Sequence, residues 1–183
     1  MNILIIGSST GGPRVIFDIF DGIPLLPLSI IIVQHMPEST TPRFARRLSQ
    51  LCMMNIIIPK DGEAIKQGSI YIAPGDYHLV LAQNEIIHID RSEKVNFVRP
   101  SIDVTMLSLT PDEKHSYYGI ILSGMGCDGA HGLLHMKKIG AKVFVQDPET
   151  CTIKSMPESA LKVTGVDQIL SPPEIHNLLL SIK

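Results

Sequence analysis

Short runs rich in Ile and Val recur along this chain, and they limit its fold more than any other feature of the sequence. Turn residues follow the runs, and several runs are apolar on both faces of an extended strand. Such strands are typical of a parallel sheet with helices packed on both sides. The predicted strands are Asn2 to Ile6, Leu28 to Val33, Asn55 to Ile58, Ile70 to Ala73, Gly119 to Leu122 and Lys142 to Val145.

Segments with helical character lie between these strands, at Thr41 to Leu51, Ile102 to Leu109 and Ala130 to Ile139. The last residues, "SPPEIHNLLLSIK", predict a closing helix opened by prolines. Alternation of strand and helix predicts βαβ units. We therefore expect an α/β fold, with a doubly wound, mostly parallel, Rossmann-like sheet and helices on both faces.

The stretch from His78 to Asp90, "HLVLAQNEIIHID", departs from this pattern, because apolar and polar residues alternate on either side of Gln83-Asn84. Two alternating strands around a tight turn predict an antiparallel hairpin. We expect this hairpin to be attached to the main sheet.

Length and charge limit the class of protein. The chain has 183 residues, 44% of them hydrophobic, and no linker or repeat divides it, so we expect one domain over residues 1–183. The formal net charge is -2, without a long block of one sign, which argues against a nucleic-acid partner. Apolar stretches fall short of the roughly 20 residues that cross a bilayer. We expect a cytoplasmic protein without membrane insertion.

The cysteines and histidines give little support for a disulfide or a metal site. Cys52, Cys127 and Cys151 are odd in number and form no CxxC pair, so we expect reduced thiols. His131 and His135 share a predicted helix face, but no Glu stands beside the first His and no third ligand is in view. We predict no metal and no cofactor.

Polar residues follow three of the predicted strands at their carboxyl ends, which gather at one edge of an open parallel sheet, where ligands bind. A hydroxyl, an imidazole and a carboxylate at one edge are the groups that serine hydrolases use for acyl transfer. These residues are Ser8, Ser9 and Thr10 after the first strand, Gln34 and His35 after the second, and Cys127 and Asp128 after "YGIILSGMG".

Residues 7–11, "GSSTG", fit the nucleophile-elbow pattern G-x-S-x-G, which points to Ser9 as the nucleophile. The chain order would be Ser, His, Asp, unlike the Ser, Asp, His order of the α/β-hydrolases. Two other interpretations stay open: the hydroxyls cap the next helix, or the glycine-rich loop binds a phosphate or dinucleotide. Against the second, G-x-G-x-x-G and G-K-[ST] are absent, and Gln34-His35 stands where an acid would hold a ribose.

The identity of the orienting carboxylate also stays open at this point. Asp76 in "APGD" and Asp147 in "FVQDP" follow strands too, so position alone does not select Asp128. Both rivals have another use, because aspartates in such positions cap turns and helices.

Taken together, the motifs resemble the catalytic domain of the chemotaxis receptor methylesterases, the CheB family, nearly end to end. They are "IGSSTGGP", "VQHMP", "GSIYIAPGDYHL", "RPSIDVTM", "GIILSGMGCDGAHGLLHMKKIGA" and "VQDPETCTIKSMPESAL". The resemblance implies hydrolysis of glutamate methyl esters, and deamidation of glutamines, on the cytoplasmic helices of chemoreceptors. It also implies these helices as partners, together with a separate receiver or regulatory protein as a further expected partner.

Carried over residue by residue, the family's nucleophile falls on Ser9, its histidine on His35 and its aspartate on Asp128. The resemblance also places Thr10 and Met125 at the active site, where their backbone N–H groups would serve as oxyanion donors. No receiver domain, which family members usually carry at the N-terminus, is expected here, since the first strand begins at Asn2.

Three positions depart from the family's pattern. Ser8 stands where alanine is common, Cys127 fills the variable place before Asp128, and Lys154-Ser155 stands where a glycine often precedes Met-Pro. Two alternative functions stay open. One is a catalytically silent module that docks on receptor helices, and the other is an esterase or amidase of this fold whose substrate is not a chemoreceptor.

Overall fold

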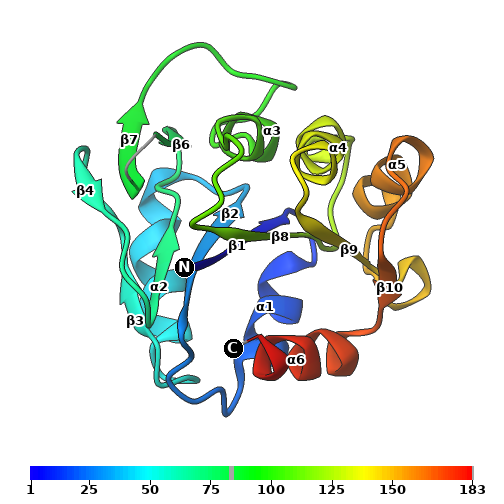
Figure 1. Ribbon diagram of the computed structural model, residues 1–183, viewed down its shortest axis with the longest axis horizontal. Coiled ribbons are helices and arrows are strands. Elements are labelled where there is room, and N and C mark those ends of the chain that lie inside the picture. Colours follow the sequence, from blue (N-terminus) through cyan, green and yellow to red (C-terminus); the bar gives the residue numbers. More distant parts are fainter. Residues whose placement is uncertain (83–84, 183) are drawn as a thin grey trace.

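The protein is described by a computed structural model covering residues 1–82 and 85–182. Its core is a seven-stranded sheet in the order β10-β9-β8-β1-β2-β5-β3, and every neighbouring pair of strands is parallel (Figure 1). The strands are β1 (Asn2–Ser8), β2 (Leu28–Gln34), β3 (Asn55–Ile57), β5 (Ser69–Ile72), β8 (Ser116–Ile121), β9 (Lys142–Gln146) and β10 (Gln168–Leu170). The predicted doubly wound α/β fold is confirmed.

Helices cover both faces of the sheet, as Figure 1 shows with the sheet seen nearly edge-on. One face carries α1 (Gly12–Phe20), α2 (Thr41–Leu48) and α6 (Pro172–Ser181), and the other carries α3 (Ile102–Leu107), α4 (Ala130–Lys138) and α5 (Ser155–Val163). Because each strand contributes alternate side chains to the two faces, two separate apolar cores form, one under each helix layer.

Local sequence signals set where the helices begin. Proline stands in the first turn of α1, α2 and α6, where a missing N–H is tolerated. Ser171 and Glu174 form a capping box at the start of α6, and the Ser101 hydroxyl accepts a hydrogen bond from the Val104 amide at the start of α3. Two short 3₁₀ turns, η1 (Glu38–Thr40) and η3 (Pro148–Thr150), follow β2 and β9.

The predicted hairpin exists, but its attachment to the main sheet was wrong. Strands β6 (His78–Leu81) and β7 (Ile86–Asp90) pair antiparallel and join β4 (Glu63–Ala64) in a separate three-stranded sheet. The reason lies in α3, whose Thr105 hydroxyl donates to the Leu79 carbonyl at 2.7 Å and whose C-terminal Ser108 hydroxyl accepts from the Leu81 amide at 3.0 Å. Hydroxyl groups of α3 therefore occupy backbone groups of β6 that would otherwise pair with a strand of the main sheet. The proposed turn at Gln83-Asn84 lies outside the described residues.

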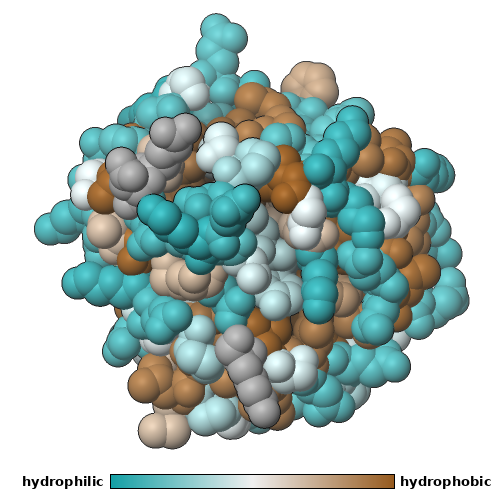
Figure 2. All heavy atoms as spheres, viewed as in Figure 1, coloured by the Kyte–Doolittle hydropathy of each residue, from teal (hydrophilic) through white to brown (hydrophobic). Residues whose placement is uncertain are grey.

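The surface is mixed in polarity. On the face shown in Figure 2, hydrophobic residues form separate patches among hydrophilic ones. Within residues 1–82 and 85–182, no helix combines the length and apolar character needed to span a bilayer.

Candidate active site

The register of the central strands brings two of the predicted site residues together. Strand β1 lies between β2 and β8, with Ser8 opposite Gln34 and Gly7 opposite Ile121. The next residues, Ser9 and His35, therefore leave neighbouring strands at the same level, and the His35 amide donates to the Ser8 carbonyl at 3.0 Å. The chain order reverses at β1, and such a switch point is where open α/β sheets bind ligands.

The loop after β8 brings the carboxylate to the imidazole. His35 Nε2 lies 2.8 Å from Asp128 Oδ2, and the two side chains are only 11% and 3% exposed. An Nε2–H that donates to the carboxylate leaves the lone pair of a neutral imidazole on Nδ1. The ring is thereby oriented with Nδ1 as the nitrogen free to accept a proton.

Asp128 is held by donors from the start of α3. The Ser101 hydroxyl donates to Oδ1 at 2.7 Å, and the backbone amides of Ile102 and Asp103 donate to Oδ2 and Oδ1 at 2.6 and 3.3 Å. The Asn96 side-chain amide adds a further bond to Oδ1 at 2.8 Å. The carboxylate is thus fixed from several directions, and its orientation does not depend on the imidazole.

These donors decide the charge of Asp128. Burial alone would raise the pKa of this carboxyl group, but hydrogen bonds from His35, Asn96, Ile102 and Ser101 outweigh the burial and hold the pKa below its ordinary value. Asp128 is therefore ionised at neutral pH, as required of a group that stabilises an imidazolium.

Hydrogen bonds fix the backbone of Ser9, whereas its hydroxyl makes none within the described residues. Its amide donates to the Ser123 carbonyl at 3.0 Å, and its carbonyl accepts from the Gly12 amide and from Gln34 Nε2. The Ser9 Oγ makes no hydrogen bond to any residue in the described part of the chain. On the other side, a Cβ added at Gly124 would lie 2.8 Å from Ser9 Cβ, so only glycine allows this approach.

Ser8 has a structural place instead. It is fully buried, and its hydroxyl donates to Gln34 Oε1 at 2.6 Å. A Cβ added at Gly12 would lie 2.6 Å from Ser8 Cβ, so the first turn of α1 covers this side chain. The hydroxyl that departs from the family's pattern is therefore buried away from solvent and occupied by Gln34.

Two free amides border the site. Thr10 and Met125 are both exposed, and neither backbone N–H donates a hydrogen bond within residues 1–82 and 85–182. Ser155 holds the loop that carries Met125, because its hydroxyl accepts from the Gly126 amide at 3.0 Å and donates to the Gly124 carbonyl at 3.1 Å. Ser155, another departure from the family's pattern, thus has a defined role in this loop.

The other candidate residues have structural roles. Asp147 accepts a hydrogen bond from the Glu149 amide at the start of η3, and Asp76 lies in a turn at φ 64. His135 Nε2 bonds to the Leu109 carbonyl at 2.8 Å. Within the part of the chain that the structure describes, no three side chains of His, Cys, Asp or Glu are grouped to hold a metal ion.

The three cysteines are free thiols. Cys127 is exposed, whereas Cys52 and Cys151 are half-buried. Burial, with the nearby carboxylates of Asp147 and Glu158, raises the pKa of Cys151 to about 11. The Cys151 thiol is accordingly protonated and unreactive at neutral pH.

Comparison with known proteins identifies the family of this chain. The family model described as CheB methylesterase matches residues 4–179. The chain belongs to the CheB methylesterase family. The crystal structure of the Thermotoga maritima CheB methylesterase catalytic domain is 39% identical, superposes with a TM-score of 0.87, and covers 96% of this chain and 97% of that one.

Curated members of the CheB family are similar over nearly all of this chain. A protein-glutamate methylesterase/protein-glutamine glutaminase 1 of Burkholderia pseudomallei is 41% identical over 91% of this chain and 47% of its own length. The Thermotoga maritima protein-glutamate methylesterase/protein-glutamine glutaminase is 39% identical over 98% of this chain and 54% of its own length. The chain spans about half the length of these curated relatives.

Sequence reasoning missed the residues that support Asp128 in this candidate site. Ser101 carried a usable signal, because a serine directly before an apolar helical segment is a typical N-cap. Asn96 carried none, since it lies in an irregular loop at φ 53 and reaches Asp128 only through the tertiary fold.

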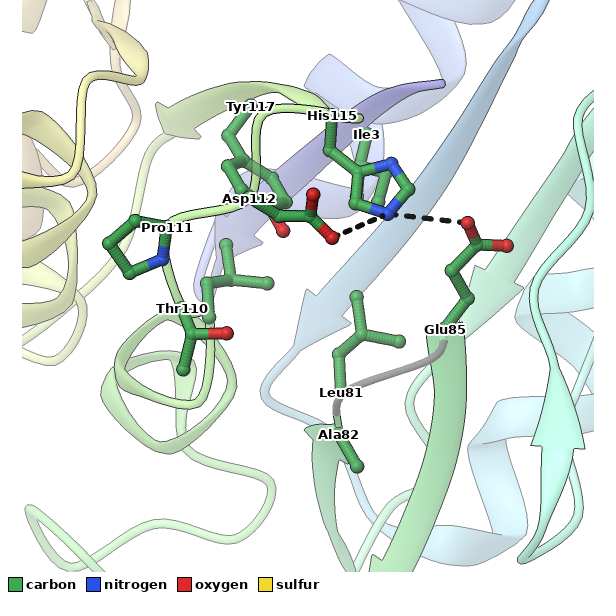
Figure 3. A pocket seen from close by; sticks show the side chains of 10 residues that line it. Ile3, Leu81, Ala82, Glu85, Thr110, Pro111, Asp112, His115 and Tyr117 are labelled. Atoms are coloured by element: carbon green, nitrogen blue, oxygen red, sulfur yellow. Dashed lines mark ion pairs between the residues drawn. The ribbon is translucent and has the colours of Figure 1, made fainter.

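A pocket lies at the edge of the sheet where the strands begin, opposite the edge that carries Ser9 and His35 (Figure 3). His115, just before β8, points between the carboxylates of Glu85 and Asp112, with its Nε2 at 3.2 and 3.5 Å from them. The cavity is about 170 Å³, and it is lined by neither Ser9 nor His35. This pocket is therefore separate from the candidate site at the carboxyl ends of the strands.

Proposed function

We propose that this chain is a serine hydrolase that demethylates glutamate methyl esters, and deamidates glutamines, on the cytoplasmic helices of chemoreceptors. The observation that carries the proposal is the short hydrogen bond between His35 Nε2 and the ionised Asp128, with Ser9 and His35 following paired residues of β1 and β2. The names of the relatives, protein-glutamate methylesterase/protein-glutamine glutaminase, support the substrate chemistry.

Acylation would begin with proton transfer from Ser9 Oγ to His35 Nδ1 as Oγ attacks the ester carbonyl carbon. Asp128 would stabilise the imidazolium through Nε2–H. The tetrahedral intermediate would then collapse, and the C–O bond to the methoxy group would break as Nδ1 returns the proton. Methanol would leave an acyl-Ser9 enzyme, and a glutamine would release ammonia by the same route.

Deacylation would repeat these steps with water. His35 Nδ1 would take a proton from water as its oxygen attacks the acyl carbon, and Ser9 Oγ would leave with that proton, releasing free glutamate. In both acylation and deacylation, negative charge develops on the carbonyl oxygen of the reacting group. The free amides of Thr10 and Met125 would donate to it, and loss of one such donor typically costs a hundredfold or more in rate.

Methanol release from a methylated chemoreceptor fragment tests this proposal. The chain is compared with Ser9→Ala, with Asp128→Asn, and with Ser8→Ala as the matched control, since the Ser8 side chain is fully buried and donates to Gln34. We expect Ser9→Ala and Asp128→Asn to lose at least a thousandfold in kcat, in line with other serine triads, and Ser8→Ala to keep most of the activity.

Three results would count against the proposal. Retention of activity by Ser9→Ala would remove Ser9 from the mechanism. Binding of the methylated fragment without release of methanol or ammonia would favour a silent docking module, and turnover of small esters alone would favour a substrate other than a chemoreceptor.

A further inference from the structure

A groove runs from His35 between the two helices that follow the site strands. It has a volume of about 540 Å³ and an apolar floor, in which the rings of Phe17 of α1 and Phe44 of α2 lie 5.2 Å apart, with Met36 beside them. One end of the groove reaches His35 itself, so any segment seated in it is continuous with the active site.

Three arginines of α2 border this groove: Arg43, Arg46 and Arg47. All three are exposed, and none forms an ion pair with a carboxylate of the described residues. Within those residues, the lining includes no Asp or Glu. A concentrated positive charge therefore lies beside the active site of a chain whose net charge is -2.

The requirements of α2 itself do not explain this charge. Arg46 and Arg47 lie in the last turn of α2, where the helix dipole stabilises positive charge. Arg43 lies in the first turn, where the dipole destabilises it. Like charges three and four residues apart also weaken a helix by a few tenths of a kcal/mol. The arginines thus carry a small cost in α2, which suits a role in binding anionic groups.

We infer that this groove binds an acidic amphipathic helix of the substrate, with its apolar stripe on Phe17 and Phe44 and its carboxylates on the arginines. This inference rests on the proposed function and names how its substrate is recognised. Each turnover of that reaction converts a neutral ester or amide into a carboxylate. Other glutamates of the same helix, three or four residues from the reacting one, lie one turn away and would present negative charge to the arginines.

Binding is tested in the Ser9→Ala background, so that it does not depend on turnover. The probe is a labelled receptor-helix peptide with glutamine at the reacting position and glutamates one turn to either side, and the control peptide has glutamine throughout. We expect the acidic peptide to bind more tightly, and its Kd to rise steeply between about 50 and 300 mM salt.

The triple variant Arg43→Ala/Arg46→Ala/Arg47→Ala should raise that Kd on the order of tenfold or more and flatten the salt dependence. Lys114→Ala is the matched control, because Lys114 is exposed at the opposite edge of the sheet. In the active chain, the triple variant should raise KM for the acidic fragment much more than it changes kcat.

Equal affinity for the two peptides, or an unchanged Kd in the triple variant, would overturn the inference. So would self-association of the unsubstituted chain that the triple variant abolishes, because a second copy would then be the partner that covers the groove. If the Ser9→Ala chain binds the acidic peptide as expected while the unmodified chain releases no product, the inference stands and the proposed function fails.

Discussion

Asn96, in the loop before α3, bonds directly to the carboxylate that holds the active-site histidine. Its Nδ2 donates to Asp128 Oδ1 and to Asp103 Oδ2, both at 2.8 Å, so one neutral amide bridges two buried carboxylates. Burial raises the pKa of Asp103, and the Asp128 charge raises it further. Asn96 therefore separates two like charges while orienting the one that holds His35.

Replacing this amide should slow catalysis. In Asn96→Ala, Asp128 loses one donor and faces Asp103 without the bridge, so we expect kcat to fall on the order of tenfold with little change in KM. The acid limb of the pH–rate profile should shift, which a purely structural role would not produce. Asn177→Ala, at an exposed position on α6, serves as the control. An unchanged profile would assign Asn96 to loop structure alone.

At the scale of elements, the loop between β8 and α4 depends on the start of α5. Ser155 bonds to both Gly124 and Gly126, so it fixes the segment in which the free Met125 amide lies. This contact joins residues about 30 positions apart, so the spacing of the sequence motifs could not reveal it. From the sequence, Lys154-Ser155 could be recognised only as a departure from the family's pattern.

Ser155→Ala should therefore lower kcat for ester hydrolysis by about three- to tenfold, the effect of one or two lost hydrogen bonds. KM should stay nearly constant if Met125 acts only on the transition state. Ser181→Ala, an exposed serine at the end of α6, is the control. A proportional rise in KM with unchanged kcat would place the loop in substrate binding instead.

At the scale of the whole molecule, the main sheet could be predicted from sequence, because strands buried on both faces are apolar throughout. Topology predicted that His35 would meet a carboxylate at the shared edge of the strands, but it did not select Asp128 over Asp76 and Asp147, which only the family resemblance did. The attachment of the hairpin could not be predicted, because it depends on hydroxyl groups of α3 that face β6 only in the folded chain. The support of Asp128 by Asn96 depends on tertiary contacts in the same way.

This support makes the stability of the fold depend on pH. The pKa of Asp128 is lower in the folded chain than the ordinary value near 3.9. Its ionised form therefore stabilises the fold fully above about pH 4, and this contribution is lost as the pH falls through the lower folded pKa. Asp103 has a raised pKa, so its ionised form lowers the stability of the fold. Removal of the Asp128 charge relieves part of the free-energy cost of burying the Asp103 carboxylate.

Asp128→Asn should accordingly lower the free energy of unfolding at pH 7, by about 1–3 kcal/mol, because several buried donors lose an ionised acceptor. The difference from the unsubstituted chain should narrow as the pH falls below about 4, since that chain then loses the same contribution. Urea unfolding at pH 7, 5 and 3 measures both effects, with Asp21→Asn, at an exposed position after α1, as the control. A difference that stays constant down to pH 3 would mean that packing around Asp128, and not its charge, stabilises this edge of the sheet.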